Sequence, residues 1–220
     1  MSNNKKTVLI EQSRIAFNAR GYGALNLHEL AQLLEMSRGH LAYHFKDKEE
    51  LLKAIVDQMW EELDRDLVSS RKFPSFENLH KEVQLYYEYQ KRYSFVFLDS
   101  NLMSHPYVSE RFQTMTEQSI EANKATLMLS LSTGNLKPEP IPGVYSNIAF
   151  ITWMLSFFWL SQQVIRGEKT SEDGEKMIWS IIVPHFTEKG LNKFKDFFGE
   201  AYYNSLGDSV DSSIINAGTF

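Results

Sequence analysis

The sequence predicts an all-α protein, with a three-helix helix-turn-helix region at the N-terminus and a larger helical region after it. Apolar residues recur at three- and four-residue intervals along most of the chain, which is the period of an α-helix. Long alternating stretches that would indicate strands are absent from the sequence. Glycines and prolines fall between the periodic segments, where they end helices. At 220 residues the chain can form one large domain, or a small domain joined to a larger one.

The first helix is expected from about residue 4 to Arg20. Gly21 directly after it suits a C-terminal cap. The residues expected on its inner face are Leu9, Ile10, Ser13, Ala16 and Phe17.

The next two helices are short, and capping residues mark their starts. Asn26, with Glu29 three residues later, forms an Asn variant of the capping box. Ser37 then caps a third helix that runs to about His44. The buried face of the second helix is expected to carry Leu27, Leu30, Ala31 and Leu34.

A longer fourth helix links the two regions of the chain. Asp47 with Glu50 predicts a second capping box at its start, and it should run to about Ser70, before Pro74. Its core-spaced residues are Leu52, Ile55, Val56, Met59 and Leu63.

Six further helices are expected, separated by prolines and glycines. They fall near residues 75–92, 94–103, 107–132, 143–167, 171–188 and 190–204. Pro184 should kink or shorten its helix. The expected division is 1–52 for the helix-turn-helix domain, 53–206 for the larger helical domain and 207–220 for a mobile tail.

Composition excludes several classes of protein. The hydrophobic fraction of 43% and charged fraction of 23% are those of a soluble globular chain, which disfavours disorder, collagen and coiled-coil fibres. The absence of cysteine excludes a disulfide scaffold, a thiolate zinc site, an iron–sulfur cluster and a cysteine nucleophile. The apolar run Val8–Ile10 is too short for a secretory signal. We therefore expect a cytoplasmic protein.

The net charge of −5 disfavours a polyanion partner for the chain as a whole, but the charge is unevenly spread. Residues 1–52 hold seven Lys or Arg against six acids, a net of +1, and the rest carries −6. Three of the six histidines also lie in this first region: His28, His40 and His44.

The stretch Ile148–Ile165 is nearly apolar over about 18 residues, the lower limit for a membrane-spanning helix. Thr, Ser and Gln residues interrupt it, and no Lys/Arg cluster flanks it. We favour a helix buried on several sides, by its own core and by a partner subunit. No membrane association is predicted.

The second and third helices match a helix-turn-helix, in which the second helix of the pair enters the DNA major groove. Leu41 and Phe45, four residues apart, can pack inward on the third helix. Gly39 would allow close approach of DNA to the backbone. Arg38, His40 and Tyr43 would project from the other sides. The helix N-termini at Ser37 and Asp47 suit phosphate oxygens, and Lys48 adds a charge there.

These segments resemble the tetracycline-repressor (TetR) family of bacterial one-component regulators. Leu9-Ile10, Phe17 and Gly21-Tyr22 resemble the family's first helix and turn, and Asn26–Ala31 resembles its second helix. The most specific segment is Ser37-Arg-Gly-His-Leu-Ala-Tyr-His-Phe45 followed by Lys46-Asp-Lys48-Glu-Glu-Leu51, which resembles the recognition helix and the start of the fourth helix. The match covers about a quarter of the chain.

The resemblance implies roles for eight residues. Base-edge or groove contacts would come from Arg38, Gly39, His40 and Tyr43. Phosphate contacts would come from Asn26, Ser37, His44 and Lys48.

Three positions depart from the family pattern. Ala42 replaces a usual phosphate-contacting Tyr, Asn26 replaces Thr, and Glu35 replaces the turn's usual Gly. Glu35 either places an acid against the phosphates and lowers affinity, or shifts the turn and tilts the recognition helix.

Other chemistries find little support in the sequence. His40 and His44 have the i, i+4 spacing of a metal pair, but no HExxH motif or nearby third ligand accompanies them. Nucleophile-elbow, phosphate-loop and triad motifs are absent. We predict no metal, no cofactor and no enzymatic activity.

In the family, the second region binds an effector and forms the dimer through its last two long helices, here about 143–167 and 171–204. The stripe Trp153, Phe157, Leu160 and Val164 could meet Met177, Ile181 and Phe186 across such an interface, or form intrachain core. The helices from 75 to 165 are rich in aromatic residues and methionine, which would suit an apolar or aromatic effector. The sequence assigns no single residue as an effector contact. These are Tyr86, Tyr89, Phe95, Phe97, Met103, Phe112, Met115 and Trp153.

The sequence thus predicts a homodimeric regulator, a repressor in the first instance, that binds a palindromic double-stranded operator and is released by an effector of unknown identity. The alternative is a DNA-binding regulator without a small-molecule effector, controlled through a protein partner on the second region. A helical enzyme is a more distant alternative.

Overall fold

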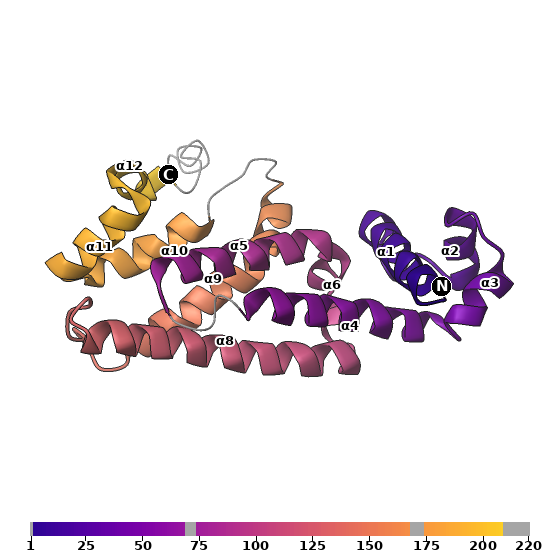
Figure 1. The fold of residues 1–220 in the computed structure, drawn as a ribbon, viewed down its shortest axis with the longest axis horizontal. Helices are drawn as coiled ribbons and strands as arrows, with labels where there is room; N and C mark the ends of the chain where they lie inside the picture. Colours follow the sequence, from indigo (N-terminus) through magenta and orange to yellow (C-terminus); the bar gives the residue numbers. More distant parts are fainter. Residues whose placement is uncertain (1, 69–73, 168–173, 209–220) are drawn as a thin grey trace, which may run out of the picture. The chain divides into compact units, whose positions relative to one another are not determined.

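The fold is described from a computed structural model, which places residues 2–68, 74–167 and 174–208 (Figure 1). The N-terminal helices are α1 (Ser2–Arg20), α2 (Leu27–Leu33), α3 (Arg38–His44) and α4 (Lys48–Leu67). The later ones are α5 (Phe76–Arg92), α6 (Ser94–Leu98), α7 (Ser100–Met103), α8 (Pro106–Ser132), α9 (Val144–Arg166), α10 (Gly174–Ile182), α11 (Glu188–Phe198) and α12 (Glu200–Asn204). Short 3₁₀ helices cover Val183–His185 and Leu206–Asp208. Within the described residues there is no strand, which confirms the all-α prediction.

The described residues pack into two compact units. The first contains the described residues up to Val68 together with Glu88–Phe112. The second contains the described residues from Pro74 to Tyr87 and those after Phe112. The predicted boundary at residue 52, between the helix-turn-helix domain and the larger helical domain, stays a prediction. Of the predicted mobile tail, residues 209–220 lie outside the described residues.

The predicted caps form at the starts of α2, α3 and α4. Asn26 Oδ1 accepts from the backbone N–H groups of His28 and Glu29, and Glu29 Oε2 accepts from Asn26 N at 2.8 Å, which completes a capping box. Ser37 Oγ accepts from the N–H of the third residue of α3. Asp47 caps α4 in the same way, but the predicted capping box is incomplete, because Glu50 Oε2 accepts from Lys46 N instead of from Asp47 N.

The core of the first unit is built from the faces that the sequence pattern predicts. Phe17, Leu30 and Leu41 are fully buried, as is Phe45. The ring of Phe17 contacts that of Phe95 in α6, with 5.5 Å between centroids. The buried residues of α4 continue this core: Leu51, Leu52, Ile55, Val56, Met59, Trp60, Leu63 and Leu67.

Aromatic rings dominate the core of the second unit. Phe76 of α5 makes edge contacts with Trp179 of α10 and Phe194 of α11, at centroid distances of 5.5 and 5.6 Å. Tyr145 and Ile148 of α9 belong to the same buried cluster. Helices α5, α9, α10 and α11 are thereby held around one aromatic centre.

Pro184 shortens its helix, as predicted. Helix α10 ends at Ile182, and residues Val183–His185 form a single 3₁₀ turn. Phe186 then has extended backbone and forms an isolated antiparallel bridge with Leu136. A lost N–H and a fixed φ at proline explain the break.

Two other predicted helices are interrupted. Asp99 separates α6 from α7, because its carboxylate caps α7 by accepting from Asn101 N at 2.9 Å. Gly199, with φ +89°, separates α11 from α12. The predicted ranges 94–103 and 190–204 contained no signal strong enough to mark either break.

By length and composition alone, helix α9 could cross a membrane. Within the described chain, 22% of its most apolar 18-residue window is buried. Its exposed large apolar side chains are Phe150, Met154, Phe158, Val164 and Ile165. The predicted interface stripe lies partly inside the unit, since Phe157 is buried and Trp153 and Leu160 are half-buried. A neighbouring stripe of α9 is therefore the one left uncovered.

Candidate nucleic-acid interface

A tight turn joins α2 to α3. Met36 N donates to Ala31 O at 3.0 Å, and Glu35 N donates to Gln32 O at 3.1 Å, which is the bond pair of a Schellman motif. This motif needs a left-handed residue, and Glu35 supplies it with φ +53°. Glu35 therefore takes the conformation that favours glycine, and its side chain is exposed.

Helix α3 buries one side and exposes the other. Leu41 and Phe45 are fully buried, and α3 packs against α2. The exposed side carries Arg38, Gly39, His40 and Tyr43. Tyr43 is 82% exposed. Because tyrosine usually buries part of its ring, Tyr43 is available to a partner.

Gly39 is not required by internal packing. A Cβ atom at this position would meet no atom closer than Ser37 Oγ, at 4.0 Å. The surface above Gly39 is therefore open, and a ligand backbone can approach α3 closely there.

His44 lies beside the exposed residues and is half-buried. Its ring centroid is 5.4 Å from that of His40 and 5.1 Å from that of Tyr43. These three rings form one cluster on α3. In the described part of the chain, no group of three or more metal-ligating side chains occurs, so this histidine pair gains no further ligand.

The two capping residues keep donors for DNA. Asn26 and Ser37 are both exposed, and each uses an oxygen to accept from backbone N–H groups. The Asn26 amide N–H₂ and the Ser37 hydroxyl proton can still donate to a phosphate. Their positions at the N-termini of α2 and α3 also place the positive ends of two helix dipoles nearby.

Lys48 is fixed by the turn between α1 and α2. Its Nζ donates to Tyr22 O at 2.9 Å and to Leu25 O at 2.8 Å, and lies 4.1 Å from the Tyr22 ring centroid. Partial burial lowers the pKa of Lys48, although Glu29 opposes this effect. An ammonium has three N–H donors, so one remains for a phosphate. Nothing in the sequence pairs Lys48 with this turn.

Lys6 was not among the predicted contacts. Its Nζ lies 5.2 Å from the centroid of the Phe45 ring, at the C-terminal end of α3. This contact places the positive charge of Lys6 next to the C-terminal end of α3. The Lys5-Lys6 pair at the start of the chain was the available signal.

The structure thus brings the eight predicted residues together on α3 and on the first residues of its neighbours. Their roles as DNA contacts stay predictions.

Comparisons with known proteins identify the family of the chain. Residues 9–55 match the sequence model described as bacterial regulatory proteins of the tetR family, and residues 58–194 match one described as bacterial transcriptional repressor, TetR. A relative described as the uncharacterized HTH-type transcriptional regulator YhgD, from Bacillus subtilis strain 168, is 24% identical over 143 residues. That alignment covers 63% of this chain and 75% of YhgD.

Solved structures show the same fold. A TetR-family regulator from Marinobacter aquaeolei VT8 has a TM-score of 0.75 and 19% identity, over 90% of this chain and 98% of that one. AibR, solved in complex with isovaleryl coenzyme A and operator DNA, has a TM-score of 0.59 and 13% identity, over 82% of this chain and 97% of AibR.

The two matched sequence models cover the helix-turn-helix region and most of the later helices. The all-helical fold agrees with that of the TetR-family regulator from Marinobacter aquaeolei. The chain belongs to the TetR family of bacterial transcriptional regulators, which bind DNA through a helix-turn-helix.

Proposed function

We propose that the protein is a cytoplasmic repressor that binds a palindromic operator as a homodimer and is released by an apolar or aromatic small molecule. This proposal rests on the two different sides of α3, one buried and one exposed. Two fully buried residues, Leu41 and Phe45, fix the helix, while its opposite side is exposed and carries groups that recognise bases.

The eight contacts divide into two kinds. Arg38, His40 and Tyr43 would read base edges, because guanidinium and imidazole groups offer hydrogen bonds in the major groove, and Gly39 would admit the DNA. Phosphates would be bound by Asn26, Ser37, His44 and Lys48.

The dimer is supported by the uncovered face of α9. Phe150, Met154 and Phe158 follow one another at four-residue steps, and Ile165 lies two further turns along the same side. Met128 and Leu129 of α8 are also exposed. An exposed apolar stripe along a helix, such as this one on α9, is typical of a subunit interface. A two-fold axis would place two α3 helices about one DNA turn apart, roughly 34 Å.

An effector is supported by an indole in the second unit. Trp153 Nε1 is buried and has no hydrogen-bond partner among the described residues. Buried polar groups are normally paired, so this N–H suits a ligand with a hydrogen-bond acceptor on an apolar or aromatic body. The complex of AibR with an acyl coenzyme A is consistent with small-molecule control in this fold.

A fluorescence-anisotropy titration tests the proposal. Labelled DNA from immediately upstream of the gene is compared with a scrambled duplex at several salt concentrations. We expect selective binding that weakens as salt rises. Native mass spectrometry of the purified protein then asks whether a small molecule copurifies. Operator recognition would be contradicted if the protein bound the upstream and scrambled duplexes equally well and also bound sites selected from random DNA no more tightly than the scrambled duplex.

A further inference from the structure

Helix α1 holds the corner between α5 and α6 through one side chain. Asn18 Nδ2 donates to Arg92 O, the last carbonyl of α5, at 2.7 Å. Asn18 Oδ1 accepts from Phe95 N, in the first turn of α6, at 3.1 Å. Both backbone groups belong to helix ends, where no partner exists within the helix. One amide therefore satisfies two helix ends that lie 74 and 77 residues away in the sequence.

Arg14 lies one turn earlier on the same side of α1 and reinforces this contact. Its guanidinium donates to the same carbonyl of Arg92. It also binds both carboxylate oxygens of Glu11, with Nε–Oε2 at 3.0 Å and Nη2–Oε1 at 2.5 Å. Arg14 is only 8% exposed, so its charge depends on these two partners.

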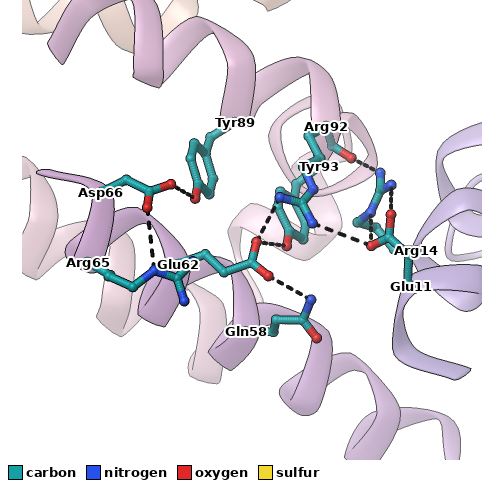
Figure 2. Close-up of polar contacts among 9 residues, drawn as sticks. All are labelled: Glu11, Arg14, Gln58, Glu62, Arg65, Asp66, Tyr89, Arg92 and Tyr93. Atoms are coloured by element: carbon teal, nitrogen blue, oxygen red, sulfur yellow. Dashed lines mark hydrogen bonds and ion pairs between the residues drawn. The ribbon is translucent and has the colours of Figure 1, made fainter. Parts of the chain in front are cut away.

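The contacts continue into α4, as Figure 2 shows. The Arg92 guanidinium lies 2.9 Å from Glu62 and 3.7 Å from Glu11. Tyr93, which is fully buried, donates its hydroxyl proton to the same carboxylate oxygen of Glu62, Oε2, at 3.1 Å. Burial, with the Glu62 charge, raises the pKa of Tyr93, so its hydroxyl stays a donor. Helices α1, α4 and the end of α5 thus share one polar network.

This network, which we call the α1 clamp (Glu11, Arg14, Asn18, Glu62, Arg92 and Tyr93), is directional. Hydrophobic contacts such as Phe17 with Phe95 hold α1 in place but tolerate small rotations, because they depend weakly on angle. Hydrogen bonds weaken steeply when their angles change. The clamp therefore restricts how α1, and with it the α2–α3 pair, is oriented on α4, α5 and α6.

We propose that Asn18 and Arg14 are positioning residues that set which half-site spacing the dimer accepts. Arg14 is buried and Asn18 is half-buried against the α5–α6 corner, so they act through the orientation of α3. The inference rests on the proposed binding of a palindrome by a dimer. If the α2–α3 pairs of the two subunits have a fixed orientation, they can bind half-sites at one spacing only. If they can rotate, they can bind half-sites at several spacings.

The test uses the full chain and a palindrome selected from random duplexes with the wild-type protein. Anisotropy gives affinities for this site, for versions with the central spacer changed by one or two base pairs, and for an isolated half-site. In the Asn18→Ala variant, we expect the preference for the original spacing to fall at least about fivefold, which corresponds to the loss of about one net hydrogen bond. Half-site affinity should stay within about twofold.

Two further variants keep the result interpretable. Arg14→Lys retains the charge but loses the guanidinium geometry, and should reduce the spacing preference in the same direction. Asn101→Ala, at an exposed position of α7 outside the α1 clamp, should leave the preference unchanged. Circular dichroism confirms that each variant is folded, and if Asn18→Ala is unfolded, Arg14→Lys decides.

The outcomes separate the two proposals. Folded clamp variants that discriminate spacings as strongly as the wild type would overturn the positioning role alone. A uniform loss of affinity for all sites, half-site included, would also overturn it, because that is the result of mere destabilisation. If the selection yields no paired half-sites for the wild-type protein, the proposed dimeric recognition fails, and the positioning role fails with it.

Discussion

Glu35 is a residue whose backbone and charge have separable consequences. The left-handed conformation at φ +53° costs an L-residue roughly 1 kcal/mol or more. We therefore expect Glu35→Gly to raise the free energy of unfolding by about 0.5–1 kcal/mol. Urea titration followed by circular dichroism measures this change.

The matched control for Glu35 is Glu35→Ala. It removes the charge but keeps the Cβ atom, so it should bring no gain in stability. If the carboxylate repels DNA phosphates, both variants should bind the operator more tightly and by similar factors. A gain in affinity confined to the glycine variant would point to backbone strain instead.

Arg38 and Lys48 are expected to contribute differently to DNA binding. Arg38→Ala should cost about 1–3 kcal/mol on the preferred site and relax base choice, because it removes a base-edge contact. Lys48→Ala should weaken all DNA about equally and lower the salt slope by roughly one. Anisotropy with the selected site and single-base variants, at four salt concentrations, measures both effects.

Lys48 also holds the turn at Tyr22 and Leu25, so stability provides a second measurement. We expect Lys48→Ala to lower the free energy of unfolding by about 1 kcal/mol, since the ammonium is only partly buried and solvent screens it. An unchanged salt slope together with this destabilisation would assign Lys48 to the turn rather than to a phosphate.

At the scale of helices, local chemistry made much of the fold predictable. The caps at Asn26, Ser37 and Asp47 formed where the sequence placed them, because each needs only an oxygen within three residues of a free N–H. The breaks at Asp99 and Gly199 were missed. An aspartate inside an apolar segment is compatible with either a helix or a cap, and the surrounding packing decides between them.

Helix α9 supports a prediction about assembly. Phe158 is 42% exposed, in the middle of the uncovered apolar stripe. A charge there would have to be buried on association, so Phe158→Glu should raise the dimer dissociation constant at least tenfold. Sedimentation equilibrium measures the constant, and operator affinity should fall towards that of a half-site.

Leu98→Glu is the matched control, because Leu98 is equally exposed, at 42%, but belongs to α6. It should leave association unchanged. A dimer that tolerates Phe158→Glu and dissociates with Leu98→Glu would move the interface from α9 to α6.

For the molecule as a whole, the candidate DNA contacts were more predictable from the sequence than the α1 clamp. The eight DNA contacts lie within a short stretch, Asn26–Lys48, where spacing along the chain determines position on the helices. The α1 clamp joins Glu11 and Arg14 to Arg92 and Glu62, which lie far apart in the sequence. Charged residues at helical spacing usually face solvent, so no local pattern distinguishes a member of a buried network from a solvated one.

The clamp also makes stability depend on pH. A hydrogen bond from Arg14, with the charges of Arg14 and Arg92, lowers the pKa of Glu11 despite its partial burial. A carboxyl with a lowered pKa takes up its proton less readily in the folded state than in the unfolded chain. Its contribution is therefore present above the unfolded pKa of about 4.3 and is lost as the pH falls through the folded value.

We accordingly expect the free energy of unfolding to fall more steeply between about pH 5 and pH 3 in the wild type than in Glu11→Gln. The difference should stay below about 1 kcal/mol, since Glu11 is partly exposed and solvent screens the pair. Urea titrations at half-unit pH intervals measure it, with Glu121→Gln, an exposed position of α8, as the control. If both variants follow the same pH profile, the Glu11–Arg14 pair does not stabilise α1. If Glu11→Gln alone flattens the profile, the buried guanidinium of Arg14 depends on this carboxylate, and acid weakens the α1 clamp.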